Sequence, residues 1–342
     1  MFFNPSHILF FSTLLMGSFM TISANSWLGA WMGLEINLLS FIPLMIDTKN
    51  SMSTEAALKY FITQALASSV LLFSILIYFS QTHFSNFMFN SYSSVNILIN
   101  SCLLLKMGAA PFHFWFPNVM EGLTWMKSLI LLTIQKLAPL ILLSYSLQPT
   151  LIFIIVIMSV IIGATGGLNQ TSLRKIMAFS SINHVGWILS GMLISETAWM
   201  TYFLMYSFLT MMIIQLLNMF QLFYFSQLFS FMNNSPLIKF SLFTSLLSLG
   251  GLPPFLGFFP KWLLMQQMIE NNMITLMIIM VTVTLIALFF YIRLFYSSVL
   301  FNFSELSWNF KNLNNKIINK LMINNFVTLS GLFFMTFIYA CI

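Results

Sequence analysis

Long apolar stretches separated by short polar connections make up most of the chain. Because the apolar residues run on continuously instead of alternating with polar ones, the pattern predicts transmembrane helices and disfavours a transmembrane β-barrel. We therefore predict an all-α, polytopic membrane protein that forms a single transmembrane domain over residues 1–342. About eleven spans are expected, at residues 7–24, 27–46, 56–80, 95–114, 125–145, 150–168, 173–193, 198–222, 237–269 (broken at Pro253 and Pro254), 273–298 and 322–341.

The composition supports a membrane protein and narrows its chemistry. The chain is 59% hydrophobic and 6% charged, whereas a soluble domain is roughly 25% charged. The two cysteines, Cys102 and Cys341, are too few and too far apart for an iron–sulfur or zinc site. No phosphate-binding loop, dinucleotide fingerprint or haem-type histidine pair is visible. We expect no cofactor, no metal and no nucleic-acid partner for this chain.

The basic residues predict an orientation. Lys or Arg falls near connections that follow even-numbered spans, and connections after odd-numbered spans carry none. The face with the cations should be the cytoplasm or matrix. Eleven spans would then place the N-terminus on that face and the C-terminus on the opposite one. The loop cations are Lys49, Lys59, Lys127, Arg174, Lys175, Lys239, Arg293, Lys311, Lys316 and Lys320.

Four charged residues lie inside predicted spans: Glu35, Lys106, Lys136 and Lys261. A charge at the centre of a transmembrane helix costs about 2.5–3.5 kcal/mol, so such residues usually mark an ion or proton path. The alternatives are snorkelling of a lysine to the interface and a structural ion pair for the glutamate. The small residues Gly29 and Gly33, four positions apart, predict that Glu35 faces protein.

Proline and glycine interrupt the fourth and ninth spans, which carry Lys106 and Lys261. Spans five apart run in opposite directions, and paired broken helices in inverted halves indicate the ion site of a transporter. We predict inverted five-helix repeats at about residues 7–145 and 150–298, with span 322–341 outside them. Ordinary proline kinks are the alternative.

Two histidines and one connection complete the set of polar candidates. His113 follows Lys106 in the first break, and His184 lies in a helix with serines and an asparagine. Histidine titrates near neutral pH, so both are candidates for a proton relay, with a packing role as the alternative. Glu121 and Lys127 are interpreted as a solvated pair in a connection.

Four motifs carry a family resemblance. They are LNQTSLRKIMAFSSINHVGW (residues 168–187), PFHFWFP (111–117), QKLAPL (135–140) and GGLPPFLGFFPKW (250–262). Together they resemble the antiporter-like membrane subunits of mitochondrial respiratory complex I. The richness in phenylalanine and methionine suggests an invertebrate member. The family's fold has fourteen spans, and its animal members of this type lack the first three, which agrees with eleven.

The resemblance implies roles for individual residues. Glu35 matches a glutamate that tunes Lys106, Lys136 matches a bridging lysine, and Lys261 matches the exit-side residue. His113 and His184 join them as proton-translocation candidates. Where relatives often carry glutamate, this chain has Asn118, which puts in doubt an acidic role there.

The same resemblance implies a function and partners. The chain would be a core membrane subunit of a proton-translocating NADH:ubiquinone reductase, with no redox site of its own. NADH, flavin, iron–sulfur clusters and ubiquinone would belong to partner subunits. Other membrane and accessory subunits and the lipid bilayer, with cardiolipin as a candidate lipid, would surround it. The expected location is the mitochondrial inner membrane, with the N-terminus in the matrix and the C-terminus in the intermembrane space.

Two further functions remain open at this point. A stand-alone secondary antiporter would use the same lysines to exchange a cation for protons. A passive structural member of a membrane assembly would hold its charges in fixed ion pairs.

Overall fold

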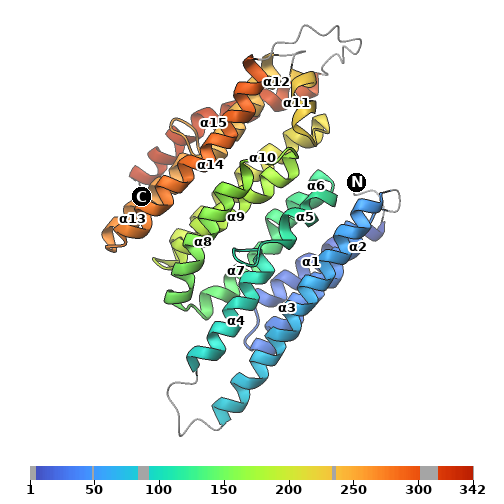
Figure 1. The fold of residues 1–342 in the computed structure, drawn as a ribbon, viewed down its shortest axis with the longest axis vertical. Coiled ribbons are helices and arrows are strands. Elements are labelled where there is room, and N and C mark those ends of the chain that lie inside the picture. Colours follow the sequence, from blue (N-terminus) through green and yellow to red (C-terminus); the bar gives the residue numbers. More distant parts are fainter. Residues whose placement is uncertain (1–4, 48–49, 84–91, 233–235, 301–314, 342) are drawn as a thin grey trace. The chain divides into compact units, whose positions relative to one another are not determined.

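The computed structural model describes residues 5–47, 50–83, 92–232, 236–300 and 315–341, and these are folded into helices (Figure 1). The chain divides into two compact units, residues 1–159 and 160–342. Their helices are α1 (Pro5–Ile22), α2 (Trp27–Met45), α3 (Ser51–His83), α4 (Tyr92–Met107), α5 (Trp115–Gly122), α6 (Trp125–Leu132), α7 (Ile134–Tyr145), α8 (Pro149–Gly167), α9 (Leu173–Met192), α10 (Glu196–Phe220), α11 (Phe225–Met232), α12 (Pro236–Gly250), α13 (Phe258–Glu270), α14 (Ile274–Leu300) and α15 (Asn315–Cys341).

Each predicted span coincides with one helix or with two consecutive helices. In the described part of the chain, seven helical stretches are long and apolar enough to cross a membrane. Three shorter apolar helices, at Ser94–Met107, Leu237–Gly250 and Leu321–Phe337, match the fourth, ninth and eleventh predicted spans. The multi-pass helical architecture is therefore confirmed, whereas the count of eleven spans stays a prediction.

Helix α9, the seventh predicted span, is not among these apolar stretches, and it carries serines, an asparagine and a histidine. Almost its entire length from Ile176 to Met192 is buried within the protein. A helix that is surrounded by protein does not need an apolar surface toward lipid. Its polar side chains therefore lie in the interior of the second unit.

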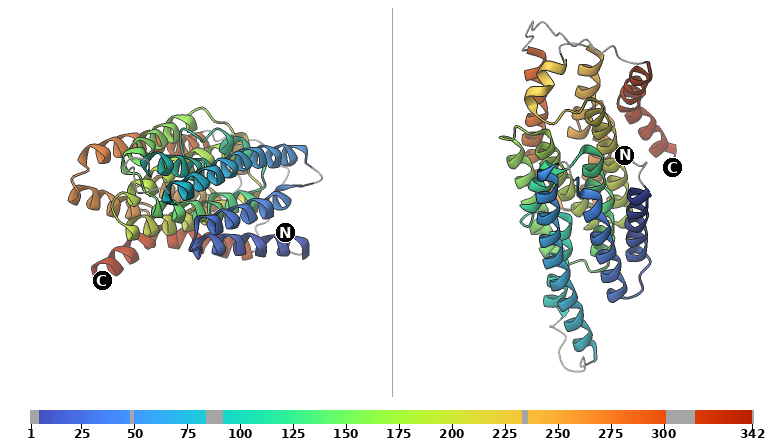
Figure 2. Two further views of the ribbon diagram at one scale, coloured as in Figure 1. Left: turned by 90° about the horizontal axis from the view of Figure 1, so that it is seen from below. Right: turned by 90° about the vertical axis from the view of Figure 1, so that its right-hand side faces the viewer.

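In the first unit, α1 packs on α2, and α2 packs on α3 (Figures 1 and 2). Glycines of both helices, Gly17 and Gly33, lie in the α1–α2 contact. A Cβ atom on Gly33 would lie 2.6 Å from Cγ2 of Thr21 and 2.9 Å from the carbonyl oxygen of Gly17. Small residues permit such close helix contacts in membranes. Here they bring α1 against the turn of α2 that contains Gly33, two residues before Glu35.

In the second unit, α9 packs on α10, and α12 contacts α10, α14 and α15. Helix α15 also contacts α13, and its Thr328 carbonyl accepts a hydrogen bond from the backbone N–H of Leu256 at 3.2 Å. Leu256 lies in the segment between α12 and α13, so α15 satisfies part of the backbone where that span is interrupted.

The α1–α2 contact predicts different effects for two glycines of α2. Gly33→Ala should destabilise the subunit by about 1–3 kcal/mol, because the added methyl group meets backbone atoms of α1. Gly29→Ala should be neutral or stabilising, because its Cβ would meet only side chains, at 3.3 Å or more, and alanine favours the helix by about 1 kcal/mol. The thermal midpoint of the detergent-solubilised protein measures both. Equal midpoints would contradict the packing role of Gly33.

Candidate functional site

The first interruption begins at Gly108, which follows the last residue of α4 and lies two residues after Lys106. Gly108 has a φ of +73°, a conformation that glycine adopts without steric cost. The N–H groups of Gly108 and Ala109 donate to the carbonyls of Leu105 and Leu104, both at 3.1 Å. This pair of bonds is a Schellman motif, which satisfies the last carbonyls of a helix. The indole N–H of Trp115 also donates to Leu105, at 3.1 Å.

Lys106 lies in the last turn of α4 and is 8% exposed. The carboxylate of Glu35, on α2, acts electrostatically on it. The two groups do not form a direct ion pair, since Lys59–Glu55 and Lys127–Asp47 are the pairs that the structure gives in this unit. Glu35 is half-buried, and its Oε2 atom is buried without a hydrogen-bond partner in the described part of the chain. The Glu35 carboxylate and the Lys106 ammonium group therefore interact electrostatically without direct contact.

Lys136 lies in the first turn of α7 and is 2% exposed. Its Nζ atom lies 4.9 Å from the centre of the Phe116 ring, a cation–π contact. A second interruption, absent from the predicted spans, separates α6 from α7 at Thr133, where φ is −116° and ψ is −74°. Pro139 cannot donate to the carbonyl four residues before it, but it lies inside α7, so no proline marks the break itself. Lys136 is thus beside an interrupted backbone, like Lys106.

A chain of neutral side chains connects α3, α7 and α2 near these lysines. The Tyr60 hydroxyl donates to Oε1 of Gln135 at 3.2 Å, and Nε2 of Gln135 donates to Oδ1 of Asn37 at 3.0 Å. Sequence reasoning missed all three residues, although Gln135 directly precedes Lys136. Their common signal is polarity inside an apolar span, and it is weaker than that of a charge.

The third interruption, between α12 and α13, has the same beginning as the first. Gly251 has a φ of +76°, and its N–H donates to Ser248 at 3.1 Å while that of Leu252 donates to Leu247 at 3.4 Å. In both interruptions a cis peptide bond precedes the proline three residues after the glycine, Pro111 and Pro254. The two segments also share a sequence, PFHFWFPN (residues 111–118) and PFLGFFPK (residues 254–261).

Lys261 is 7% exposed and lies in the first turn of α13. Its ammonium group donates to the carbonyl of Gly250 at 2.7 Å, the last residue of α12. Its side chain also lies against Gly251, where a Cβ atom would approach Nζ to 2.9 Å. The hydrogen bond to Gly250 turns the Lys261 side chain into the protein.

Lys106 and Lys261 are on opposite sides of their interruptions, the first before the glycine and the second after it. The shared sequence places Asn118, not Lys106, at the position that corresponds to Lys261. Asn118 is exposed and donates to the carbonyl of Phe114 at 3.2 Å. The similarity of the two interruptions is local, and the inverted halves stay a prediction.

His184 lies in a buried aromatic group of the second unit. It is 4% exposed, and its Nδ1 atom is 2.9 Å from the Tyr202 hydroxyl. The Tyr206 ring centre is 5.0 Å from the histidine ring. Trp187 stacks on Tyr202, with 6.2 Å between the ring centres. The Nζ atom of Lys261 lies over the same Trp187 ring, 5.8 Å from its centre. Aromatic rings thus connect His184 with Lys261.

His113 lies within the first interruption and is 7% exposed. Its Nδ1 atom is 3.2 Å from the carbonyl of Pro111, and its ring lies 4.4 Å from that of Phe114. Both contacts are to its own segment. The structure therefore places it beside the end of α4, and its relay role stays a prediction.

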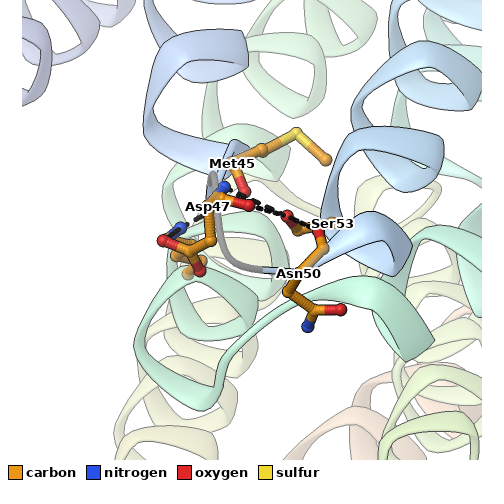
Figure 3. A network of polar contacts seen from close by, with 5 residues as sticks. Met45, Asp47, Asn50 and Ser53 are labelled. Carbon is orange, nitrogen blue, oxygen red and sulfur yellow. Dashed lines mark hydrogen bonds and ion pairs between the residues drawn. The ribbon is translucent and has the colours of Figure 1, made fainter.

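Lys127 is not part of a solvated pair with Glu121, as the sequence suggested. It is 4% exposed, its Nζ atom lies 2.8 Å from Oδ1 of Asp47, and it donates to the carbonyl of Met45 at 3.2 Å. Ser53 exchanges hydrogen bonds with the Asp47 backbone, at 3.0 and 3.1 Å, so the first turn of α3 is bonded directly to the residue that pairs with Lys127 (Figure 3). The correction follows from burial, which sequence spacing does not reveal.

Comparison with known proteins identifies the family. The family model described as NADH:quinone oxidoreductase/Mrp antiporter, TM, matches residues 24–287. NADH-ubiquinone oxidoreductase chain 2 of Anopheles gambiae is 54% identical over 336 residues, which cover 98% of either chain. The protein of the same name from Aedes aegypti has the same identity and coverage. The chain belongs to the NADH-ubiquinone oxidoreductase chain 2 family.

The fold agrees with this membership. A chain of respiratory complex I from Thermus thermophilus matches with a TM-score of 0.83 at 24% identity, over 96% of this chain and 78% of that one. The predicted all-α, antiporter-like fold is therefore confirmed, as is the resemblance to an invertebrate member of the chain 2 family.

The Asp47–Lys127 pair predicts an asymmetry between its two ends. Asp47→Asn should cost about 2 kcal/mol or more, because it leaves the Lys127 ammonium buried without its counter-charge. Lys127→Met should cost about 1 kcal/mol, because the side chain of Asp47 is 36% exposed and stays hydrated. Lys59→Met, which breaks an exposed pair, should change stability by no more than about 0.5 kcal/mol. Thermal midpoints of the three variants measure this order, and a larger effect of Lys127→Met would contradict it.

The Gly251 contact predicts that this position is intolerant. Gly251→Ala should destabilise the chain by about 1–3 kcal/mol, because alanine is strained at positive φ and its methyl group displaces Lys261. Gly250→Ala is the matched control, since its Cβ would make an ordinary contact at 3.4 Å with Tyr291. The thermal midpoint again measures the effect. Equal tolerance at the two glycines would show that Lys261 does not depend on this backbone.

Proposed function

We propose that this chain is the proton-translocating chain 2 subunit in the membrane part of mitochondrial respiratory complex I. The family and the names of its relatives support the assembly. The observation that carries the mechanism is the burial of three lysines, each within a helical turn or so of an interrupted backbone. Charged groups inside a membrane protein that turn away from lipid usually mark an ion or proton path.

The lysines have distinct roles in this proposal. The Glu35 carboxylate tunes the charge of Lys106 through its electrostatic interaction with that lysine. Lys136 receives the proton as a bridge, and Lys261 loads or releases the terminal proton. A lysine can exchange a proton when it is buried, whereas an arginine stays charged. His113 and His184 are further relay members, and water molecules would connect the groups.

The wider topology is part of the same proposal. Eleven spans with the N-terminus in the matrix follow from the distribution of loop cations. The locally similar interruptions support inverted halves. Electron transfer from NADH to ubiquinone takes place on other subunits, which carry the flavin and the iron–sulfur clusters. This chain holds no redox group, and it contacts other subunits and lipid, with cardiolipin as a candidate.

A second candidate function is exchange of a cation for protons by the chain alone. The description of the family model names Mrp antiporters beside NADH:quinone oxidoreductase, which favours it. This function predicts transport by the purified chain in vesicles, driven by an ion gradient without NADH. The proposed function predicts no such transport.

Replacement of a relay lysine should uncouple pumping from electron transfer. In the assembled complex, Lys106→Met and Lys136→Met should each lower the number of protons pumped per NADH, or slow coupled NADH oxidation by about tenfold or more. The reason is that a positioned proton-transfer group typically contributes roughly 10²–10⁴-fold to a rate. Proton uptake by inner-membrane vesicles during NADH oxidation measures the ratio.

Lysine-to-arginine variants separate titration from structure. A fixed ion pair would work with arginine, but a proton relay would not, because guanidinium does not release its proton in proteins. Lys106→Arg and Lys136→Arg should therefore fail as the methionine variants do. Lys59→Met, at an exposed lysine of α3, should pump normally. Full pumping by both methionine variants in a normally assembled complex would contradict the proposed function.

A further inference from the structure

The side chain of Phe116 contacts both the first interruption and Lys136. Its Cβ, Cγ and Cδ2 atoms lie against Gly108, where a Cβ atom on the glycine would approach them to 3.2 or 3.3 Å. The Nζ atom of Lys136 lies over the face of the same ring, 4.9 Å from its centre. Because Gly108 follows Lys106 by two residues, one aromatic ring connects the end of α4 with the charged group of α7.

The backbone of Lys106 and the Phe116 ring are fixed relative to each other. Phe116 is 1% exposed, and its backbone N–H donates to the carbonyl of His113 at 3.0 Å. The ring of Trp115 packs edge-on against it at 5.4 Å, and the Trp115 indole N–H donates to the carbonyl of Leu105 at 3.1 Å. The start of α5 is thus bonded to α4 one residue before Lys106 and packed against the chain two residues after it.

The contact between this ring and Lys136 depends on the charge of the lysine. A ring face attracts a cation through its quadrupole, and a neutral amine has no net charge to be attracted. Lys136 is 2% exposed, and the cation–π attraction is stronger where the cation is desolvated. The four-carbon stem of lysine is flexible, so its nitrogen can occupy more than one position. The ring therefore holds the protonated side chain in place more firmly than the deprotonated one.

A second lysine of the proposed relay shows the same arrangement. In the second unit, the Nζ atom of Lys261 lies 5.8 Å from the centre of the Trp187 ring. Both residues are buried, and tryptophan has the most attractive ring face of the aromatic residues. An aromatic face beside a buried ammonium group therefore occurs in each unit, at a lysine to which proton transfer is assigned.

We propose that Phe116 is a positioning residue for proton transfer, whose ring face holds the protonated Lys136 beside the end of the helix that carries Lys106. This inference rests on the proposed function, because a position that favours the charged lysine has a purpose only if that lysine exchanges its proton. When the proton passes to the next member of the relay, the electron pair stays on Nζ and the attraction ends. The amine can then leave the ring. Phe116 itself carries no proton.

Three variants of the assembled complex separate the ring face from packing. Phe116→Leu removes the ring and keeps an apolar side chain, and it should slow coupled proton uptake per assembled complex by about 2- to 30-fold, the range that corresponds to cation–π contacts from exposed to desolvated sites. Phe116→Tyr keeps the ring face and should pump at close to the normal rate. Phe41→Leu is the matched control. Phe41 is fully buried and its ring packs on Tyr60 at 5.3 Å, so this variant loses a core ring of the same unit and should pump normally.

A double-mutant cycle measures whether the contact depends on charge. Phe116→Leu is introduced into the natural chain, into Lys136→Met and into Lys136→Arg. Beside methionine it removes only packing, whereas beside lysine or arginine it also removes a cation–π contact, because guanidinium is attracted to ring faces as well. The thermal midpoint of the detergent-solubilised complex should therefore fall by roughly 2–4 °C more with lysine or arginine at position 136 than with methionine, the shift expected for about one such contact in a unit of this size.

The outcomes separate this inference from the proposed function. If Phe116→Leu pumps normally while Lys136→Met fails to pump, the ring has no part in transfer and the relay stands. If Phe116→Leu and Phe116→Tyr are equally slow and the three midpoint losses are equal, the side chain serves packing and the inference is again wrong. Where pumping and the midpoints disagree, the cycle decides. If Lys136→Met pumps normally, the proposed function is wrong whatever the cycle shows, because the ring would hold a lysine that transfers no proton.

Discussion

An interrupted helix and a buried ammonium group are each costly in an apolar layer, and in this chain each reduces the cost of the other. The last carbonyls of a helix need donors, and inside a membrane water does not supply them freely. Lys261 supplies one to Gly250, at the end of α12. The backbone break gives the amine an acceptor, and the amine gives the break a donor. Their positions in the fold are therefore fixed together.

The first unit uses charge in two different ways. In the first unit, the Asp47–Lys127 pair is in direct contact and also bonded to a backbone carbonyl. Such a pair fastens α6 to the end of α2, and removal of Asp47 would leave the Lys127 ammonium buried without its counter-charge. Glu35 and Lys106 are instead held apart on α2 and α4 while still within each other's field. Separated charges can change state without breaking a contact, which suits them to a transfer role and the Asp47 pair to a structural one.

Much of this arrangement could be predicted from the sequence, for reasons that also explain what could not. Continuous apolar runs determined the helices, and Gly108 and Gly251 with their following prolines marked two interruptions. The interruption at Thr133 was missed because threonine is common in helices and Pro139 lies six residues later. The partner of Lys127 was missed because Asp47 is distant in sequence. Tyr60, Gln135 and Asn37 were missed because hydrogen bonds among neutral groups depend on helix register, which sequence periodicity alone does not determine.

Under the proposed function, a proton would leave Lys261 without damage to the fold. An ammonium group has three N–H donors, and the neutral amine that remains after deprotonation still has two. The Gly250 carbonyl can therefore keep its hydrogen bond in both states, and the glycine against which the side chain lies needs no rearrangement. A carboxylate in this position would repel the same carbonyl when charged, because it offers no donor. Under the proposed function, the requirement that the helix end stay satisfied through every proton cycle selects an amine at this interruption.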